Sequence, residues 1–438
     1  MSDPGLILLV SLVLASTVFL VTLINTDAAI IFLIVSMLLS PELSLGAVQP
    51  DRAVVIRFDD LLLGVVFVSW LAKLTINKEL GLIRSTPLNL PIGLFLVSCV
   101  VSTGWGVLNG EVTKPLAAVF YLLKYVEYCF LFVMIANVIR DRRQVKLFLI
   151  WLLTVAVIVS VFGYWQIFRY GPGFRITAPF EGSHAEPNTL AGYLLIMMAL
   201  CLGLLLYRRS RVQQLALLAL IGLMLVPFMY TYSRGGYLAF VVMYLTICVF
   251  SQRYRPLLWG LLVLGVFLIP TVIPSTVSER IAETFDPRSS VQFGGMRLSR
   301  SPAYRLLVWK LVIEKWFQHP FLGSGVTGLG FLVDNQHALV LGEVGLLGVL
   351  VYIWVRWRLL TISFRHFKTM TDPLAQGLCL GFVAGLAGLL VQSFAGEVFI
   401  IVRIMEPFWF LAAIVVVLPR LVAPASAPSV PVPRLLRA

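Results

Sequence analysis

Residues 188–231 read NTLAGYLLIMMALCLGLLLYRRSRVQQLALLALIGLMLVPFMYT, which is two apolar runs separated by a basic segment. The runs, 188–207 and 213–231, are each about 20 residues long, the length at which an α-helix crosses the hydrocarbon core of a bilayer. The arginines between them mark a loop of the kind that stays in the cytoplasm. This stretch therefore predicts two membrane-spanning helices that are joined on the cytoplasmic side.

The same pattern continues through most of the 438 residues, which are 59% hydrophobic and only 13% charged. Soluble domains carry about 25% charged residues, so the composition is typical of a membrane protein. We predict an all-α fold, a polytopic membrane helix bundle with 12–13 transmembrane helices. The apolar runs are 5–24, 28–41, 58–75, 88–108, 116–138, 146–168, 188–207, 213–231, 236–251, 256–273, 338–356, 375–395 and 399–419.

These runs divide the chain into four parts. Residues 1–273 are expected to hold transmembrane helices 1–10, and residues 338–420 helices 11–13. Between them, residues 274–337 are predicted to form a large periplasmic loop with an interfacial, amphipathic helix at about 302–318. The Pro- and Ala-rich segment 421–438 is predicted to be a disordered cytoplasmic tail. The five cysteines all lie in apolar runs without paired spacing, so neither a disulfide framework nor a metal site is predicted.

Lysines and arginines indicate the orientation, because cytoplasmic loops carry an excess of them. From the third run onward, basic clusters follow every second run, as alternating crossings predict. We assign these loops and the C-terminus to the cytoplasmic side of the membrane, which explains much of the +13 net charge without a nucleic-acid partner. The clusters are Lys73, Lys78 and Arg84; Arg140, Arg142, Arg143 and Lys146; Arg208, Arg209 and Arg211; Arg253 and Arg255; and Arg356, Arg358, Arg365 and Lys368.

The complementary loops, 169–187, 231–236 and 274–337, carry arginines on the face where the positive-inside rule disfavours them. Some of these arginines should meet an anionic ligand there, and the alternative is local pairing with neighbouring acids such as Glu186. The arginines are Arg169, Arg175, Arg234, Arg280, Arg288, Arg297, Arg300 and Arg305.

Arg234 stands out because it lies in Tyr232-Ser233-Arg234-Gly235-Gly236, directly before a predicted helix. The glycines allow a close backbone approach, and a guanidinium beside the free amides of a helix start can bind phosphate. The alternative is an interfacial arginine that meets lipid headgroups.

Arg305 lies in the predicted 302–318 helix on one stripe with Trp309, Val312 and Trp316, so it points towards the buried side. The opposite stripe holds Lys310, Glu314 and Gln318. A buried arginine needs a partner, for which a substrate phosphate would serve. Snorkelling of the guanidinium towards water is the alternative.

The segments after this helix offer further polar groups. The Gly-rich turn from His319 to Val326 could hold a phosphate or simply end the helix. If the next helix begins at Asp334, this carboxylate and His337 share one face and form a pair that could act as a general base. Asp334 is equally well explained as the N-cap of that helix.

Two other sets of charged residues have functional and structural explanations. The loop before the seventh run supplies Glu181, His184, Glu186 and Asn188. Their spacing matches no zinc pattern, and capping or hydroxyl binding is favoured. Within the membrane, Lys124 with Glu127 and Arg403 with Glu406 are spaced i, i+3, which favours structural pairs on each helix.

Four segments between about 170 and 350, all expected on one side of the membrane, together resemble the superfamily of O-antigen ligases and Wzy-type polysaccharide polymerases. Members are multi-spanning, metal-independent glycosyltransferases of the GT-C type. The segments are Arg175 with Pro187-Asn188-Thr189-Leu190-Ala191-Gly192; Tyr232-Ser233-Arg234-Gly235-Gly236; Tyr304-Arg305 and Trp309 with His319-Pro320-Phe321-Leu322-Gly323-Ser324-Gly325; and Asp334-Asn335 with Glu343-Val344-Gly345-Leu346-Leu347-Gly348.

The resemblance implies a donor glycan on an isoprenoid, undecaprenyl, pyrophosphate that lies in the bilayer with its sugars outside. Arg234 and Arg305 match the two essential arginines of the family, and with Arg175 and Arg300 they would bind the pyrophosphate without a metal or other cofactor. The other expected partners are an acceptor glycan or glycolipid and membrane lipids. The expected sugar- and acceptor-binding residues are Asn188, Glu186, His184 and Asn335.

The sequence departs from the ligase pattern at one position. Asp334 stands where ligases have the catalytic histidine, and His337 lies three residues later. The base is therefore Asp334 or His337, and the reaction is either polymerisation or ligation to lipid A-core. A transporter or flippase of the lipid-linked glycan is the alternative from another class, but the charges gather at one boundary rather than at the midplane.

Overall fold

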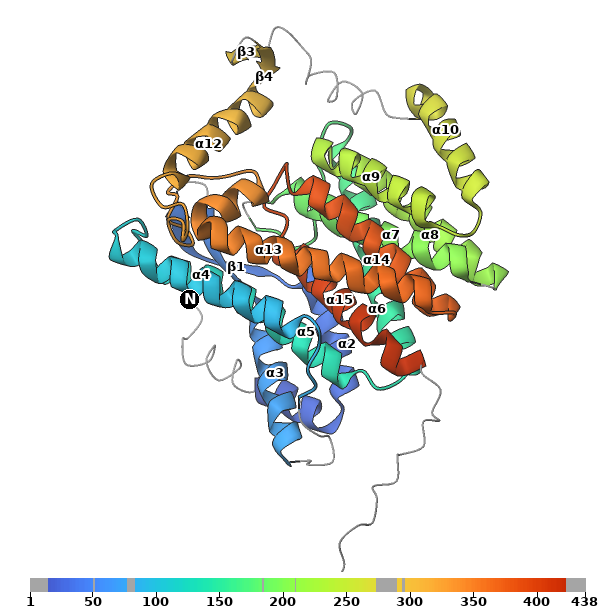
Figure 1. Ribbon diagram of the computed structural model, residues 1–438. Helices are drawn as coiled ribbons and strands as arrows, with labels where there is room; N and C mark the ends of the chain where they lie inside the picture. Colours follow the sequence, from blue (N-terminus) through green and yellow to red (C-terminus); the bar gives the residue numbers. More distant parts are fainter. Residues whose placement is uncertain are drawn as a thin grey trace, which may run out of the picture.

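The computed structural model describes residues 15–49, 52–76, 83–182, 185–208, 210–272, 290–293 and 296–422. Helices dominate this part of the chain, and the predicted all-α class is confirmed (Figure 1). Two short antiparallel hairpins, which were not predicted, lie between helices. β1 (Glu42–Gln49) pairs with β2 (Arg52–Arg57), and β3 (Ser290–Phe293) pairs with β4 (Met296–Ser299).

Within the described residues, one helix corresponds to each predicted apolar run. A helix over 15–24 comes first. It is followed by α2 (Thr26–Leu39), α3 (Phe58–Ile76), α4 (Asn89–Leu108), α5 (Pro115–Val138), α6 (Arg142–Tyr170), α7 (Pro187–Tyr207), α8 (Arg211–Tyr230), α9 (Arg234–Phe250), α10 (Arg255–Val272), α12 (Arg300–Trp316), α13 (Gln336–Thr369), α14 (Pro373–Gln392) and α15 (Val402–Val422).

Eight of the described helices, α4 to α8 and α13 to α15, are long and apolar enough to cross a membrane. The helix over 15–24, α2, α9 and α10 are apolar but shorter. The chain is thus a multi-pass membrane protein. The amphipathic character predicted for 302–318 is found in α12, where Lys310 and Glu314 are exposed and Val312 is buried.

Helices α3, α5, α7, α13 and α15 finish at the same end of the bundle. The ends of α3, α5 and α15 line one cavity, and Arg208, directly after α7, lies near Asp372, which follows α13. At this end, Arg84 N–H donates to Asn137 and Arg420 donates to Ser85 O. We call this end, where these five helices finish, the basic end. The opposite end, where α7, α9, α13 and α15 begin, is called the site end.

The centre of the bundle is formed by α7 and α14, which approach closely through glycines. A Cβ added to Gly203 would lie 2.3 Å from the carbonyl oxygen of Gly377 and 2.6 Å from the nitrogen of Gly381. Without side chains at these positions, the two backbones come into direct contact and gain dispersion energy, the usual basis of helix packing in membranes.

Helix α13 is interrupted at Gly345, whose φ of 65° and ψ of −169° lie outside the helical region. The backbone of residues 320–325 forms the hydrogen bonds that the residues beside the break cannot form within the helix. Ser324 N–H donates to Gly342 O and Gly325 N–H to Glu343 O, both at 2.9 Å. On the other side of the break, Leu346 N–H donates to Pro320 O at 2.9 Å. The turn and the helix are therefore joined by backbone hydrogen bonds.

Side chains complete this junction. Ser102 Oγ donates to Glu343 O at 2.6 Å, and the Glu343 carboxylate accepts from Thr327 N–H at 2.7 Å. A Cβ on Gly323, at φ 71°, would lie 2.5 Å from Glu343 O. The amides of the Gly-rich turn thus serve α13, and the prediction that this turn holds a phosphate or only ends a helix is replaced by a structural role.

We expect Gly345→Ala to destabilise the protein. The φ and ψ of Gly345 lie in a region that is essentially restricted to glycine, which costs about 1–3 kcal/mol for another residue. The added Cβ would also lie 2.5 Å from Phe321 O. The melting temperature in detergent should fall clearly below that of Gly104→Ala, a control in α4 whose Cβ meets no atom within 4 Å. Equal melting temperatures for the two variants would contradict the junction.

Candidate active site

The starts of α7, α9 and α13 meet the connection between α14 and α15, residues 393–401, which we call the 393–401 loop. Ser233 Oγ donates to Asn188 Oδ1 at 2.8 Å, which links the starts of α9 and α7. Gln392 Nε2, at the end of α14, donates to Asn188 O at 3.0 Å. Gln336 N–H donates to Ser393 O at 2.9 Å, which brings in α13. Segments far apart in sequence therefore share one site.

Arg234 is the first residue of α9 and follows its cap. Ser233 Oγ accepts from Gly236 N–H at 3.1 Å, the N-cap arrangement expected for serine. A Cβ on Gly235 would lie 2.6 Å from Ala395 Cβ, so this glycine allows α9 to begin directly against the 393–401 loop. The backbone at Gly235 thus makes the predicted close approach, and its neighbour is Ala395 of the 393–401 loop.

Arg305 reaches the same loop from α12. Its Nη2 donates to Ala395 O at 3.3 Å, and its Nε is buried without a hydrogen-bond partner among the described residues. The stripe predicted from the sequence is correct, since Val312 is fully buried and Trp309 is half-buried. Arg305 and the helix that carries Arg234 therefore both contact Ala395, and the guanidinium of Arg305 retains a donor for a ligand.

Arg175 lies beside the start of α9 as well. Its Nε donates to Thr231 O at 3.2 Å, so the loop before α7 is attached to the end of α8 (Arg211–Tyr230). The structure thus brings Arg175, Arg234 and Arg305 to one end of the bundle. Two other predicted residues cannot be assessed, because His184 and the side chain of Arg300 lie outside the described residues.

The predicted Asp334–His337 pair is not formed. Helix α13 begins at Gln336, and its N-cap is Asn335, whose Oδ1 accepts from the amides of His337 and Ala338. Asn335 has extended backbone angles, φ −160° and ψ 113°, so Asp334 lies before the helix and does not share a face with His337. Asn335 has taken the capping role that was considered for Asp334.

His337 instead contacts Ser393. The Ser393 hydroxyl lies 2.8 Å from His337 Nε2 and donates its own proton to Leu390 O at 2.7 Å. In this arrangement the hydroxyl oxygen accepts, which assigns the ring proton to Nε2 and the lone pair of the neutral ring to Nδ1. Ser393, and not Asp334, is therefore the hydrogen-bond partner that orients the imidazole.

Asp334 belongs to a group of three carboxylates. Loss of water around the Glu186 carboxyl, with the nearby charges of Asp334 and Glu397, raises its pKa, while Arg175 opposes the shift. These charges interact only because the start of α7, the residue before α13 and the 393–401 loop lie close together. Glu397 was missed from the sequence, where it is a single acid in a short connection.

The intramembrane pair predicted between Arg403 and Glu406 is wrong. Arg403 is 2% exposed and pairs with Glu42 at 3.1 Å across the bundle. It also donates to Leu38 O and Pro179 O, both at 2.7 Å. The long guanidinium side chain reaches these loop carbonyls from the start of α15. Arg403 thereby holds the loop that carries Glu181 and Glu186.

The motifs can now be compared with known proteins. Residues 219–353 match the family model Wzy_C, described as O-antigen ligase. This segment of the chain is similar to the O-antigen ligase family. This confirms the resemblance to the O-antigen ligase and Wzy superfamily and indicates a glycosyltransferase-type membrane enzyme of polysaccharide assembly. No curated protein matches the chain. The matched region contains Arg234, Arg305 and Asp334, whereas Glu186 and Glu397 lie outside it.

The Glu181 carboxyl gives a pH-dependent test of the loop. Burial raises its pKa to about 8, against the attraction of Arg403. Because the folded state binds this proton more tightly than the unfolded state, its stabilising contribution is complete at acid pH and is lost as pH rises to about 8. We expect Glu181→Gln, which keeps an acceptor for Glu186 N–H, to raise the melting temperature at pH 8.5 and leave it unchanged at pH 4.5. An equal change at both pH values would contradict the shift.

Proposed function

We infer that this protein is a glycosyltransferase of the bacterial inner membrane that transfers or polymerises a glycan from an undecaprenyl-pyrophosphate-linked donor on the periplasmic face. Its pathway is the synthesis of surface polysaccharide, O-antigen or exopolysaccharide. The observation that carries this inference is the meeting of two arginine-bearing helices, α9 and α12, at Ala395 beside the carboxylates of Asp334, Glu186 and Glu397.

The arginines suit the leaving group of this reaction. When the bond between the sugar and the pyrophosphate breaks, negative charge develops on the departing lipid pyrophosphate. Arg234 and Arg305, together with Arg175, supply preorganised positive charge at the membrane boundary, where charge stabilisation is strong because little water competes. Arg305 offers an unused buried Nε–H. In this scheme the guanidinium groups serve the purpose that Mg²⁺ serves in other transferases.

A base must accept the proton of the attacking acceptor hydroxyl. Asp334 and His337 remain the candidates, and they act separately because they do not form a pair. The neutral His337 ring can receive a proton on Nδ1, since Nε2–H is held by Ser393. Asp334 lies with Glu186 and Glu397, a cluster in which like charges favour proton uptake. Glu186 and Asn188, at the start of α7, are positioned to bind acceptor hydroxyls.

The orientation follows from the charges. Arg84, Arg140 and Arg420 lie at the basic end, and cytoplasmic loops are the ones enriched in such residues. The site end is then periplasmic, where lipid-linked glycans are joined. Ligation to lipid A-core is the alternative within the family. A flippase is disfavoured by the position of the charged site at a boundary rather than at the midplane.

The arginine role predicts that Arg234→Ala and Arg305→Ala each lower the rate of glycan transfer about 100-fold or more, as the loss of a charge-stabilising donor does elsewhere. The measurement is product formation by purified variants with a lipid-pyrophosphate oligosaccharide donor. Lys310→Ala is the matched control, because this cation is exposed on the opposite stripe of α12. Normal rates in both arginine variants would refute the pyrophosphate role.

The base is identified by comparing Asp334→Asn with His337→Ala in the same assay. The variant that removes the base should lose most of the rate, because proton transfer by a positioned group contributes about 100- to 10,000-fold. The other variant should keep a substantial rate. If Asp334 is the base, Ser393→Ala should keep a substantial rate as His337→Ala does. Full activity in both Asp334→Asn and His337→Ala would show that neither group is the base.

A further inference from the structure

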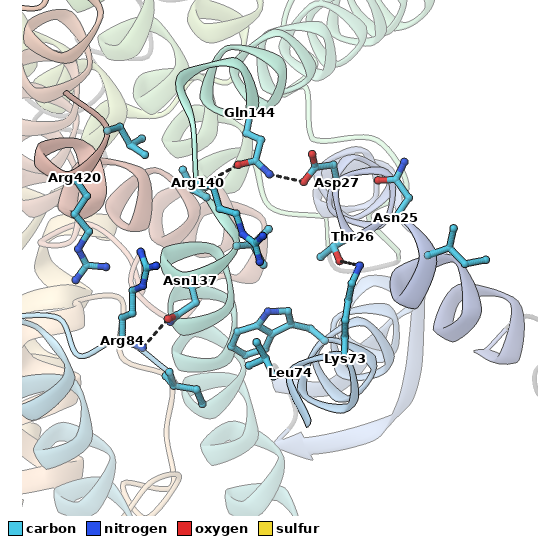
Figure 2. Close-up of a pocket in the computed structure, with 16 residues that line it drawn as sticks. Asn25, Thr26, Asp27, Lys73, Leu74, Arg84, Asn137, Arg140, Gln144 and Arg420 are labelled. Carbon is cyan, nitrogen blue, oxygen red and sulfur yellow. Dashed lines mark hydrogen bonds between the residues drawn. The ribbon is translucent and has the colours of Figure 1, made fainter. Parts of the chain in front are cut away.

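A polar cavity lies at the basic end, far from the candidate active site. It has a volume of about 500 Å³ (Figure 2). Helix α15 connects the two places, because Arg403 near its start contacts the loops of the site end and Arg420 near its end lines the cavity. With 1.5 Å of rise per residue, they lie about 26 Å apart along the helix, close to the thickness of a bilayer core. The cavity therefore belongs to the opposite membrane boundary.

The cavity is built from helix ends. The junction before α2, the ends of α3 and α5, the start of α6 and the end of α15 surround it. Hydrogen bonds hold these segments together: Gln144 Nε2 donates to Asp27 at 2.8 Å, and Lys73 Nζ donates to Thr26 Oγ1 at 3.0 Å. The lining residues are Ile24, Asn25, Thr26, Asp27, Trp70, Lys73, Leu74, Ile83, Arg84, Asn137, Val138, Ile139, Arg140, Gln144, Arg420 and Leu421.

The lining carries an excess of positive charge. It contains four cations, Lys73, Arg84, Arg140 and Arg420, and one carboxylate, Asp27, for a net charge of +3. Figure 2 shows the four basic side chains around the same opening. Lys73 lies near the like charge of Arg140 and the opposite charge of Asp27, so one carboxylate faces several cations. Such an arrangement is costly unless an anion shares the site.

Arg84 and Arg140 are held by their backbones, and their guanidinium groups remain available. Arg84 N–H donates to Asn137 Oδ1 and Arg140 N–H to Gln144 Oε1, both at 2.7 Å. Neither guanidinium forms an ion pair with a described residue. The side chains of Asn137 and Gln144 therefore fix the backbone positions from which the two guanidinium groups extend. Guanidinium groups presented in this way are suited to phosphate oxygens.

The rim of the cavity is apolar. Ile24 is 83% exposed and Ile83 is 48% exposed, next to the polar interior. At a membrane boundary these side chains face acyl chains, while the cations face the headgroup layer. A ligand that satisfies both surfaces carries a phosphate and hydrocarbon chains. A soluble phosphate would leave the apolar rim without a partner.

We propose that this cavity binds the phosphate headgroup of an anionic glycerophospholipid from the cytoplasmic leaflet. Arg84 and Arg140 contact the phosphate oxygens, Lys73 and Arg420 supply further positive charge, and the acyl chains lie along Ile24 and Ile83. The bound lipid joins the ends of α3, α5 and α15 at the basic end. This site is separate from the glycan site, so its test does not depend on glycosyl transfer.

The test is lipid binding by the purified full-length protein, measured by native mass spectrometry and by the melting temperature in detergent. Added phosphatidylglycerol should bind and raise the melting temperature, whereas phosphatidylcholine should do so weakly. Arg84→Gln with Arg140→Gln should weaken phosphatidylglycerol binding about 25-fold, at about fivefold for each cation near an anionic headgroup. Arg143→Gln with Lys146→Gln is the matched control, since both residues are exposed on α6 and do not line the cavity.

Three results would overturn the proposal. Equal binding of phosphatidylglycerol and phosphatidylcholine would show that the cavity does not select an anionic headgroup. An equal loss of binding in the control variant would show that surface charge alone is responsible. The third result is that millimolar inorganic phosphate raises the melting temperature as much as phosphatidylglycerol does, and that this effect is also lost in the Arg84 and Arg140 variant. That result would assign the cavity to a free anion. If the double variant does not fold, Lys73→Gln alone, with a smaller expected loss, replaces it.

Discussion

The backbone hydrogen bonds between the 320–325 turn and the break in α13 fix the geometry on which the site depends. Helix α12 ends just before this turn, and α13 begins shortly after it, so the junction at Gly345 sets how the two helices are placed. Arg305 comes from the first of them, and Asp334 and His337 come from the start of the second. Because Gly342 O and Glu343 O are satisfied by Ser324 N–H and Gly325 N–H, the break is stable inside the bundle.

The 393–401 loop is the common contact of the other elements. It meets Arg305 at Ala395, His337 at Ser393 and the start of α9 at Gly235. Arg403, directly after this loop, holds the carbonyls of the loop before α7. The site is thus assembled from helix starts, where polar groups can lie at a membrane boundary.

The sequence allowed much of this to be predicted, because apolar length and helical spacing are local properties. The helices, the basic end and the inward stripe of Arg305 follow from such patterns. The Arg403–Glu406 and Asp334–His337 pairs failed for one shared reason, which is that the tertiary fold and not sequence spacing decides which side chains meet. Arg403 reaches Glu42 rather than Glu406, three residues away, and His337 reaches Ser393 rather than Asp334. Asp334 and Asn335 are both good caps, and spacing alone could not decide between them.

The two proposed anion sites lie at opposite boundaries, and the one at the site end lies with Asp334 and His337, the candidate bases. The central claim is that this combination makes a glycosidic bond. The most direct measurement is incubation of the purified protein in liposomes with a labelled lipid-pyrophosphate oligosaccharide and analysis of the products. The account predicts a longer glycan, or a glycan on a new acceptor, with release of the lipid pyrophosphate. Movement of intact donor across the bilayer without a new glycosidic bond would contradict it.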